Sequence, residues 1–261
     1  MSLMRRIAAL SAGLTLMATS AASAGIPGTP WYSNAPTPAV PDPNGSGRML
    51  QDGPFSDAFS SGGNYFYSFA LGQRFSISQA QTFGSVRLWG ASEYVESGIP
   101  PWQQTRLSAN ISAIQVSIFD INGTGPASTP RHSWTVGVGS ITQTATGNFV
   151  GGNLNYSPVF RLDAALLGGY TLGAGSYLVS VGAVLTIPDG SAFAWMSGIA
   201  DGKLDATRSY GTSGDQVGEW GQWAPLVTGT TGAIEFYSEI PGPATVSLLA
   251  LGGLVRSRRR R

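Results

Sequence analysis

Hydrolytic chemistry needs a base beside a nucleophile, and this chain offers little of either. His132 is the only histidine, so a catalytic triad would depend on that one residue. It lies in a strand-like stretch after Pro130, and the sequence has no Gly-x-Ser-x-Gly turn to expose a nucleophilic serine. The absence of cysteine excludes a thiol nucleophile and thiolate metal sites, and a single histidine excludes a multi-histidine zinc site. We therefore predict that the protein is not an enzyme.

Paired carboxylates are the remaining route to catalysis, because glycoside hydrolysis needs two acids roughly 5 to 10 Å apart. Three pairs have a suitable spacing in Gly- or Ser-rich loops: Glu93 with Glu96, Asp201 with Asp205, and Asp215 with Glu219. Fourteen acids in a chain of this length make such pairs common by chance. Solvated loop charge is the simpler interpretation, and a glycan-active enzyme is kept as an alternative.

Oxygen ligands beside sharp turns are typical of calcium loops. Two short segments have them, with Asp120 and Asn122 in the first and Asp201 and Asp205 in the second. Neither segment fits an EF-hand, and Lys203 opposes a cation in the second. Asp and Asn side chains in turns more often bond their own backbone. We expect no cofactor, with calcium at these residues as the alternative.

The aromatic content suggests carbohydrate binding, because aromatic faces stack on sugar rings. The chain has seven tryptophans and nine tyrosines, but most aromatic rings of a protein fill its core. Trp89 and Trp134 lie in strand-like segments, so we expect them to be buried. Trp102 and Trp220 are flanked by Gly, Pro and polar residues, so we expect them to be exposed and able to stack on sugar.

Short strands are the elements that must position these residues. Segments of β-branched and aromatic residues, several with period-two alternation, are separated by Gly, Asn, Asp and Pro, and one helical turn is expected at Asp163–Leu167. The pattern predicts an all-β fold, specifically an antiparallel two-sheet β-sandwich of the jelly-roll type. The expected strands are Tyr65–Phe69, Gln73–Ile77, Phe83–Trp89, Ile114–Asp120, His132–Val138, Leu154–Leu162, Tyr177–Thr186, Phe193–Met196, Trp223–Leu226 and Ala233–Tyr237.

Four segments make up the predicted domain organisation. Residues 1–24 have the pattern of a secretory signal peptide, with a basic start, an apolar stretch and a cleavage site formed by Ala22 and Ala24. Residues 25–54 are a Pro- and Gly-rich arm, residues 55–239 the sandwich domain, and residues 240–261 a separate tail. Between residues 25 and 239, eight basic and fourteen acidic residues give a net charge of −6. This charge argues against nucleic acid as a partner.

The tail has the most distinctive pattern in the chain. Pro241, Gly242 and Pro243 interrupt regular structure before an apolar run, Ala244–Val255. The run is shorter than the roughly 20 residues of a full membrane span, so we expect a short membrane helix in a locally thinned bilayer. The arginines that follow it resist membrane crossing and stay on the cytoplasmic side. They are Arg256, Arg258, Arg259, Arg260 and Arg261.

This tail resembles the PEP-CTERM sorting domain of bacterial exported proteins, which has a Pro-Glu-Pro-type motif, an apolar helix and an arginine run. Gly242 stands where the family usually has Glu, and the resemblance covers less than a tenth of the chain. It implies that an exosortase, a membrane protease, recognises and cleaves the tail. It implies nothing about the activity of the preceding domain.

We therefore expect an exported, non-enzymatic protein of the cell surface or extracellular matrix. Its processing enzymes would be signal peptidase and an exosortase, and the tail would anchor it transiently in the inner membrane. The resemblance also implies a host that makes extracellular polysaccharide, which is a candidate partner. The alternative is a carbohydrate-binding module or a glycan-active enzyme on the same scaffold.

Overall fold

The structure is a computed structural model of the 261-residue chain. It describes residue 26 and residues 28–51, 57–60, 69–92, 101–122, 125–151, 156–185, 193–199, 206–209, 224–225 and 231–238. Contacts within the chain separate residues 28–240 from the two terminal segments, and every element below belongs to residues 28–240.

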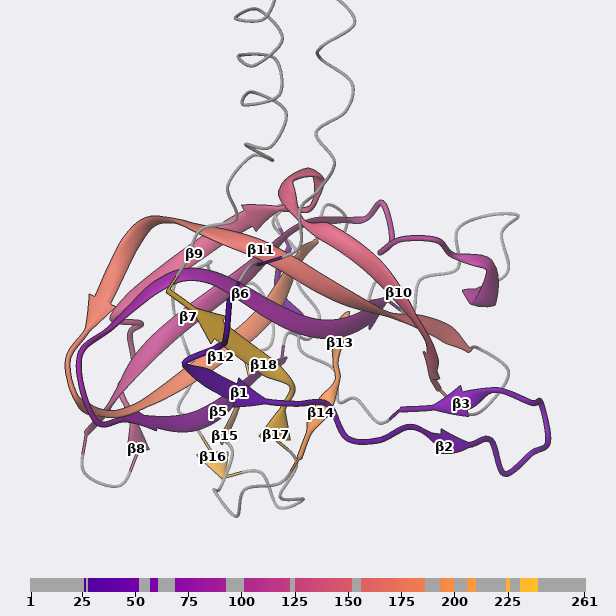
Figure 1. Cartoon of the computed structure of the whole chain (residues 1–261), viewed down its shortest axis with the longest axis horizontal. Helices are drawn as coiled ribbons and strands as arrows, with labels where there is room; N and C mark the ends of the chain where they lie inside the picture. Colours follow the sequence, from indigo (N-terminus) through magenta and orange to yellow (C-terminus); the bar gives the residue numbers. More distant parts are fainter. Residues whose placement is uncertain are drawn as a thin grey trace, which may run out of the picture. The chain divides into compact units, whose positions relative to one another are not determined.

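The described part of the chain is all-β, as the sequence predicts. Strands dominate, and long members such as β6 and β11 curve strongly (Figure 1). The helical elements of the described residues are two 3-10 turns, η1 (Pro101–Gln103) and η2 (Val138–Ser140). Among these residues, no helix has the length and apolar character needed to cross a bilayer.

The described strands form two large sheets and one two-stranded sheet, β14 (Ser197–Gly198) with β17 (Thr231–Gly232). Pairing in the first large sheet is antiparallel except between β3 and β10. Its order is β1 (Tyr32–Asn34), β18 (Ile234–Tyr237), β6 (Gln81–Ser92), β11 (Ser157–Leu172), β10 (Thr142–Val150), β3 (Met49–Leu50) and β2 (Val40–Pro41), with β13 (Phe193–Trp195) also paired to β6.

The second large sheet is antiparallel except between β4 and β12. Its order is β16 (Ala224–Pro225), β15 (Ala206–Ser209), β5 (Phe69–Ile77), β12 (Gly175–Leu185), β7 (Ile111–Asn122) and β8 (Gly125–Pro126), with β4 (Asp57–Ser60) beside β12 and β9 (His132–Gly137) beside β7. Short connections join the large sheets, one from β5 to β6 and one from β11 to β12.

One buried cluster receives side chains from both large sheets. Phe83 of β6 and Phe236 of β18 come from the first sheet, and Phe75 of β5 comes from the second. The Phe236 ring centre lies 4.8 Å from that of Phe83 and 5.8 Å from that of Phe75. Burying each of these rings contributes roughly 1.5 to 3 kcal/mol. The cluster also takes in Trp134, which is 6% exposed, whereas Trp89 is half-buried against a neighbouring cluster.

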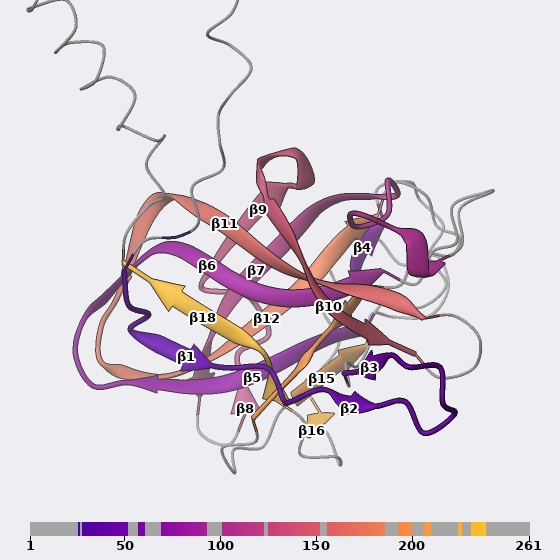
Figure 2. The same ribbon diagram turned by 45° about the vertical axis from the view of Figure 1, so that its right-hand side comes forward.

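The segment predicted as an arm contributes strands to the first sheet. Residues 32–34 pair with β18, and Trp31 and Tyr32 pack against the buried cluster. The Trp31 ring stacks on Phe236 with ring centres 5.4 Å apart. Residues 40–41 and 49–50 form a hairpin, β2 with β3, that is attached to the end of β10 (Figure 2).

The predicted helical turn at Asp163–Leu167 is wrong. These residues continue strand β11, and Leu162, Asp163 and Ala164 are paired with β6. The strand conformation is favoured over a helical turn because it buries Leu162 and Leu166 completely and puts Asp163 opposite Arg87. A single helical turn would gain few hydrogen bonds of its own.

Candidate functional site

Many residues singled out in the sequence lie outside the described part of the chain. They are Ala22, Ala24, Glu93, Glu96, Asp201, Asp205, Asp215, Glu219, Trp220, Pro241, Gly242, Pro243, Arg256, Arg258, Arg259, Arg260 and Arg261. The site below is therefore built from Trp102, Asp120 and His132 and the residues around them.

The hairpin of β2 and β3 presents Arg48 beside Trp102. Its loop has the sequence Asp-Pro-Asn-Gly-Ser-Gly, and Gly45 and Gly47 both have a φ of 75°, a conformation that glycine adopts at little cost. The Gly45 amide donates to the Asp42 carbonyl at 3.0 Å, and the Asp42 amide donates to the Arg48 carbonyl at 2.9 Å. These turns fix the backbone of Arg48.

Three aromatic rings surround the Arg48 guanidinium. Its central carbon lies 4.6 Å from the ring centre of Tyr156, 5.4 Å from that of Phe149 and 5.7 Å from that of Trp102. The rings come from separate elements: Trp102 from η1, Phe149 from β10, and Tyr156 from the residue before β11. We call Arg48, Trp102, Phe149 and Tyr156 the Arg48 cluster. Its outer ring is Trp102, which is 41% exposed.

The one carboxylate of the hairpin loop, Asp42, bonds to residues other than the arginine side chain. Its Oδ2 accepts a hydrogen bond from the Tyr156 hydroxyl at 2.6 Å, and its Oδ1 accepts one from the Asn44 amide at 3.0 Å. Hydrogen bonds from Ser46, Tyr156 and Asn44 lower the pKa of Asp42 to about 2. Among the residues that the structure describes, no carboxylate forms an ion pair with Arg48.

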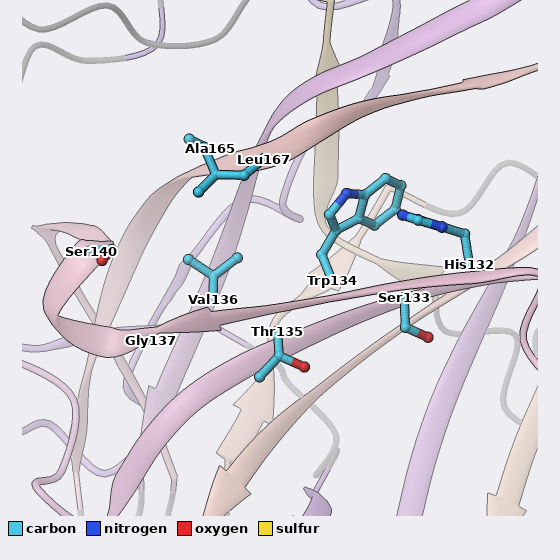
Figure 3. Close-up of a pocket in the computed structure, with 9 residues that line it drawn as sticks. All are labelled: His132, Ser133, Trp134, Thr135, Val136, Gly137, Ser140, Ala165 and Leu167. Atoms are coloured by element: carbon cyan, nitrogen blue, oxygen red, sulfur yellow. The ribbon is translucent and has the colours of Figure 1, made fainter.

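A hollow of about 560 Å³ lies along strand β9. Figure 3 shows Trp134 and Val136 on the side of β9 that faces Ala165 and Leu167 of β11. The register of β11 shifts between Ala165 and Tyr170, which places the exposed Leu167 at the edge of the hollow. The walls are mostly apolar, and the buried Nε1 of Trp134 has no hydrogen-bond partner among the described residues.

His132 lies at this hollow and contacts two aromatic rings. Its ring stacks on Tyr170 with centres 4.1 Å apart and meets Trp134 edge to face at 4.4 Å. Burial lowers the pKa of His132, which favours the neutral ring. The neighbouring Ser133 points to the opposite side of the strand (Figure 3) and shares a hydrogen bond with Ser117 at 2.9 Å. His132 and Ser133 therefore do not form a nucleophile–base pair.

Asp120, a candidate calcium ligand, is paired with an arginine. The Arg131 guanidinium donates to its carboxylate at 2.7 Å and to the Tyr170 hydroxyl at 3.1 Å. The hydrogen bond to Asp120 is the main reason that the pKa of Arg131 is raised. Asn122 ends β7, in the same strand as Asp120. No group of three or more His, Cys, Asp or Glu residues with metal-site geometry is found in the described ranges.

A third polar group lies across three strands of the first sheet. Arg87 of β6 is opposite Asp163 of β11 on one side and Glu235 of β18 on the other. Its guanidinium donates to Asp163 at 2.7 and 3.3 Å and to the Tyr237 hydroxyl at 2.9 Å. Burial lowers the pKa of Arg87, but the hydrogen bond and charge of Asp163 outweigh it and raise the pKa above its ordinary value. This group is fully paired, so we assign it to stability.

No protein family, curated protein or solved structure that we compared matches this chain. The site must therefore be interpreted from its own geometry.

Sequence reasoning singled out Trp102 but missed Arg48, Phe149 and Tyr156. One available signal was the Asn44-Gly45 step between Pro41 and Met49, which is typical of a hairpin turn. It would have placed Arg48 at the end of a turn. The sequence around Phe149 and Tyr156 gives no indication that these rings contact Arg48. The contact is long-range in sequence: Tyr156 bonds to Asp42 of the same hairpin loop, 114 residues away.

Proposed function

We propose that this chain is an exported, non-enzymatic protein of the bacterial cell surface or extracellular matrix, sorted through its tail by an exosortase. The observation that carries the proposal is the order of residues from Ile240 to Arg261: two prolines, an apolar run and an arginine cluster. Signal peptidase would remove residues 1–24, and the tail would hold the protein in the inner membrane until cleavage. The proposal is also supported by the position of β18, which ends at Tyr237, shortly before Pro241.

The test is the mass and location of the chain in a bacterial host that has an exosortase. Changing Pro241 and Pro243 together to Ala keeps the apolar run and removes the fixed backbone bend. The variant should accumulate as an uncleaved membrane-bound precursor, whereas the wild type should lose its arginine cluster. Pro130→Ala is the matched control and should be processed like the wild type. Identical masses for wild type and double variant, both retaining Arg261, would refute the proposal.

For the fold, we propose a two-sheet sandwich of the jelly-roll type. The buried cluster that receives side chains from both large sheets supports it, because a sandwich buries alternate residues of two facing sheets in one apolar layer. The short connections that pass from one sheet to the other, β5 to β6 and β11 to β12, support it as well. The parallel pairings of β3 and β4 are local additions to this plan.

A second candidate function is glycan binding at the Arg48 cluster. The observation that favours it is the exposure of Trp102 beside two further rings, because an accessible aromatic face can stack on a sugar. Trp134 in the hollow along β9 has its ring buried and in contact with His132 and Tyr170, which leaves less of the face for a ligand. Trp102→Ala should therefore weaken glycan binding, whereas a change of Leu167 to Ala should not.

A further inference from the structure

We infer that the Arg48 cluster selects glycans that carry an anionic group, a carboxylate or a sulfate, on the sugar ring. This inference rests on the second candidate function and names its ligand class. In this arrangement Arg48 binds the anion and Trp102 stacks on the ring that carries it.

The first argument concerns the ion-pair partners of arginines among the described residues. Arg87, Arg131 and Arg161 lie 2.7, 2.7 and 3.4 Å from a carboxylate oxygen. Among the described residues, Arg48 has no such partner and is held by aromatic rings instead. Its charge is therefore available to a ligand.

The second argument is the geometry of a guanidinium ion. Its five N–H donors lie in one plane. Such a planar fork can bind a carboxylate or a sulfate with two parallel hydrogen bonds.

The third argument is that the site is held in place before any ligand arrives. The hairpin is closed by backbone hydrogen bonds, and the backbone N–H of Gln51, next to β3, donates to the Phe149 carbonyl at 2.8 Å. Asp42 fixes the Tyr156 hydroxyl at 2.6 Å. Fixed side chains lose less entropy when they bind a ligand.

The charge of the domain makes the site specific for its ligand. The −6 net charge between residues 25 and 239 repels polyanions in general. Binding of an acidic glycan would therefore depend on Arg48 itself and not on a broad basic surface. Replacing this one arginine should remove the preference for charged sugars.

The test measures binding of the full chain in mild detergent, so that it does not depend on tail processing. In every protein tested, the seven arginines of residues 1–24 and 240–261 are changed to Gln, because they would attract polyanions by themselves. Two matched pairs of polymers are used: polygalacturonate with its methyl ester, and dextran sulfate with dextran. The variants are Arg48→Gln, Arg48→Lys and Trp102→Ala. Arg131→Gln is the control, because it removes the same charge from an exposed arginine that already has a carboxylate partner.

The wild type should bind at least one charged polymer about tenfold or more tighter than its neutral partner, and the polymer bound identifies carboxylate or sulfate as the group. Arg48→Gln should abolish this difference, a loss of about tenfold to a hundredfold. Arg48→Lys should restore only part of it, because lysine lacks the planar fork. Trp102→Ala should weaken the binding of charged and neutral polymers alike, by about three- to tenfold. The affinity of Arg131→Gln for each polymer should lie within about twofold of that of the wild type.

Two results would overturn the inference in distinguishable ways. Equal binding of charged and neutral polymers, with a loss in Trp102→Ala only, would keep glycan binding and end the anionic selectivity. Binding to none of the four polymers would end both. An unchanged charge preference in Arg48→Gln would also reject Arg48 as the selecting residue. None of these outcomes affects the sorting proposal, which is judged by the mass of the tail.

Discussion

Arg87 and Arg48 both lie against a tyrosine ring, but their charged groups have different partners. The Arg87 guanidinium is 5.4 Å from the ring centre of Tyr237 and donates to Asp163 at 2.7 Å. The Arg48 guanidinium is 4.6 Å from the ring centre of Tyr156, and the carboxylate of its own loop, Asp42, bonds to that tyrosine. The same residue types therefore give one arginine that is paired with carboxylates and one that has no carboxylate partner among the described residues.

Sheet register explains the first arrangement and loop chemistry the second. Asp163 and Glu235 are the direct cross-strand neighbours of Arg87, so the pairing of three strands brings opposite charges together. Arg48 follows a hairpin loop whose only acid is bonded to groups of the loop and to Tyr156. Register within a sheet therefore favours paired, structural charges, and a loop that satisfies its own acid leaves a cation for binding.

The largest expected effect is that of Arg87→Met. Asp163 has only 2% of its side chain exposed, and the change leaves this carboxylate without its main partner. Removing one member of a buried pair typically costs about 3 to 5 kcal/mol. We expect about 3 kcal/mol of unfolding free energy, the lower end of that range, because Arg161 still lies 3.4 Å from Asp163. Urea unfolding followed by tryptophan fluorescence measures it.

Arg48→Met is the matched control for this comparison. It keeps the apolar contacts with the rings and removes only the cation, so we expect a loss of about 1 kcal/mol or less. A loss as large as that of Arg87→Met would mean that Arg48 is a structural residue. A loss below about 1 kcal/mol for Arg87→Met would mean that its ion pairs are as weak as exposed ones.

The next effect concerns the two tyrosines. Tyr237→Phe removes a donor to Glu235 and an acceptor for Arg87, and we expect it to cost about 1 to 2 kcal/mol. Tyr156→Phe removes one donor to Asp42, which keeps its bonds to the loop, so its effect should be smaller. Thermal unfolding of the two variants side by side tests the order. The reverse order would show that the Tyr156–Asp42 bond is the more important of the two.

The strands could be predicted wherever one face of a strand is buried. In Phe83–Trp89 the alternation puts Val86 and Leu88 in the core, and β6 confirms it. Strand β10 was missed because its sequence, TQTATGNFV, has few apolar residues and its side chains are mostly half-buried or exposed. Strands β1, β2 and β3 were missed because proline and glycine dominate that segment, and long-range pairing decides their structure.

The site could be predicted only in part. The polar and Gly-rich or Pro-rich neighbours of Trp102 indicated an exposed ring, and this ring is 41% exposed. Its companions could not be found, because Phe149 and Arg48 are brought together by the parallel pairing of β10 with β3. A parallel contact between one residue of each strand leaves no periodic signal in the sequence.

The smallest expected effect is the acid response of Asp42. Its pKa in the folded chain is about 2, below the ordinary value of 3.8. A lowered folded-state pKa stabilises the protein fully above the unfolded value, and this contribution is lost as the pH falls through the folded value. The stability difference between wild type and Asp42→Asn should therefore be constant from neutral pH down to about 4 and should shrink between about pH 4 and pH 2. Urea midpoints across this range measure it, and the difference between the two proteins cancels the titration of all other acids.

Tyr156→Phe sharpens this last test, because it removes one of the bonds that lower the pKa of Asp42. In that background the stability difference between the proteins with and without the Asp42→Asn change should be smaller at neutral pH, and its loss on acidification should be complete at a higher pH, closer to the ordinary carboxyl value. The same shift in a Tyr237→Phe background would contradict the assignment, since Tyr237 belongs to the Arg87 group. A pH response that is identical with and without the Tyr156 hydroxyl would mean that Asp42 does not hold this ring. The rigid support proposed for the Arg48 cluster would then be lost.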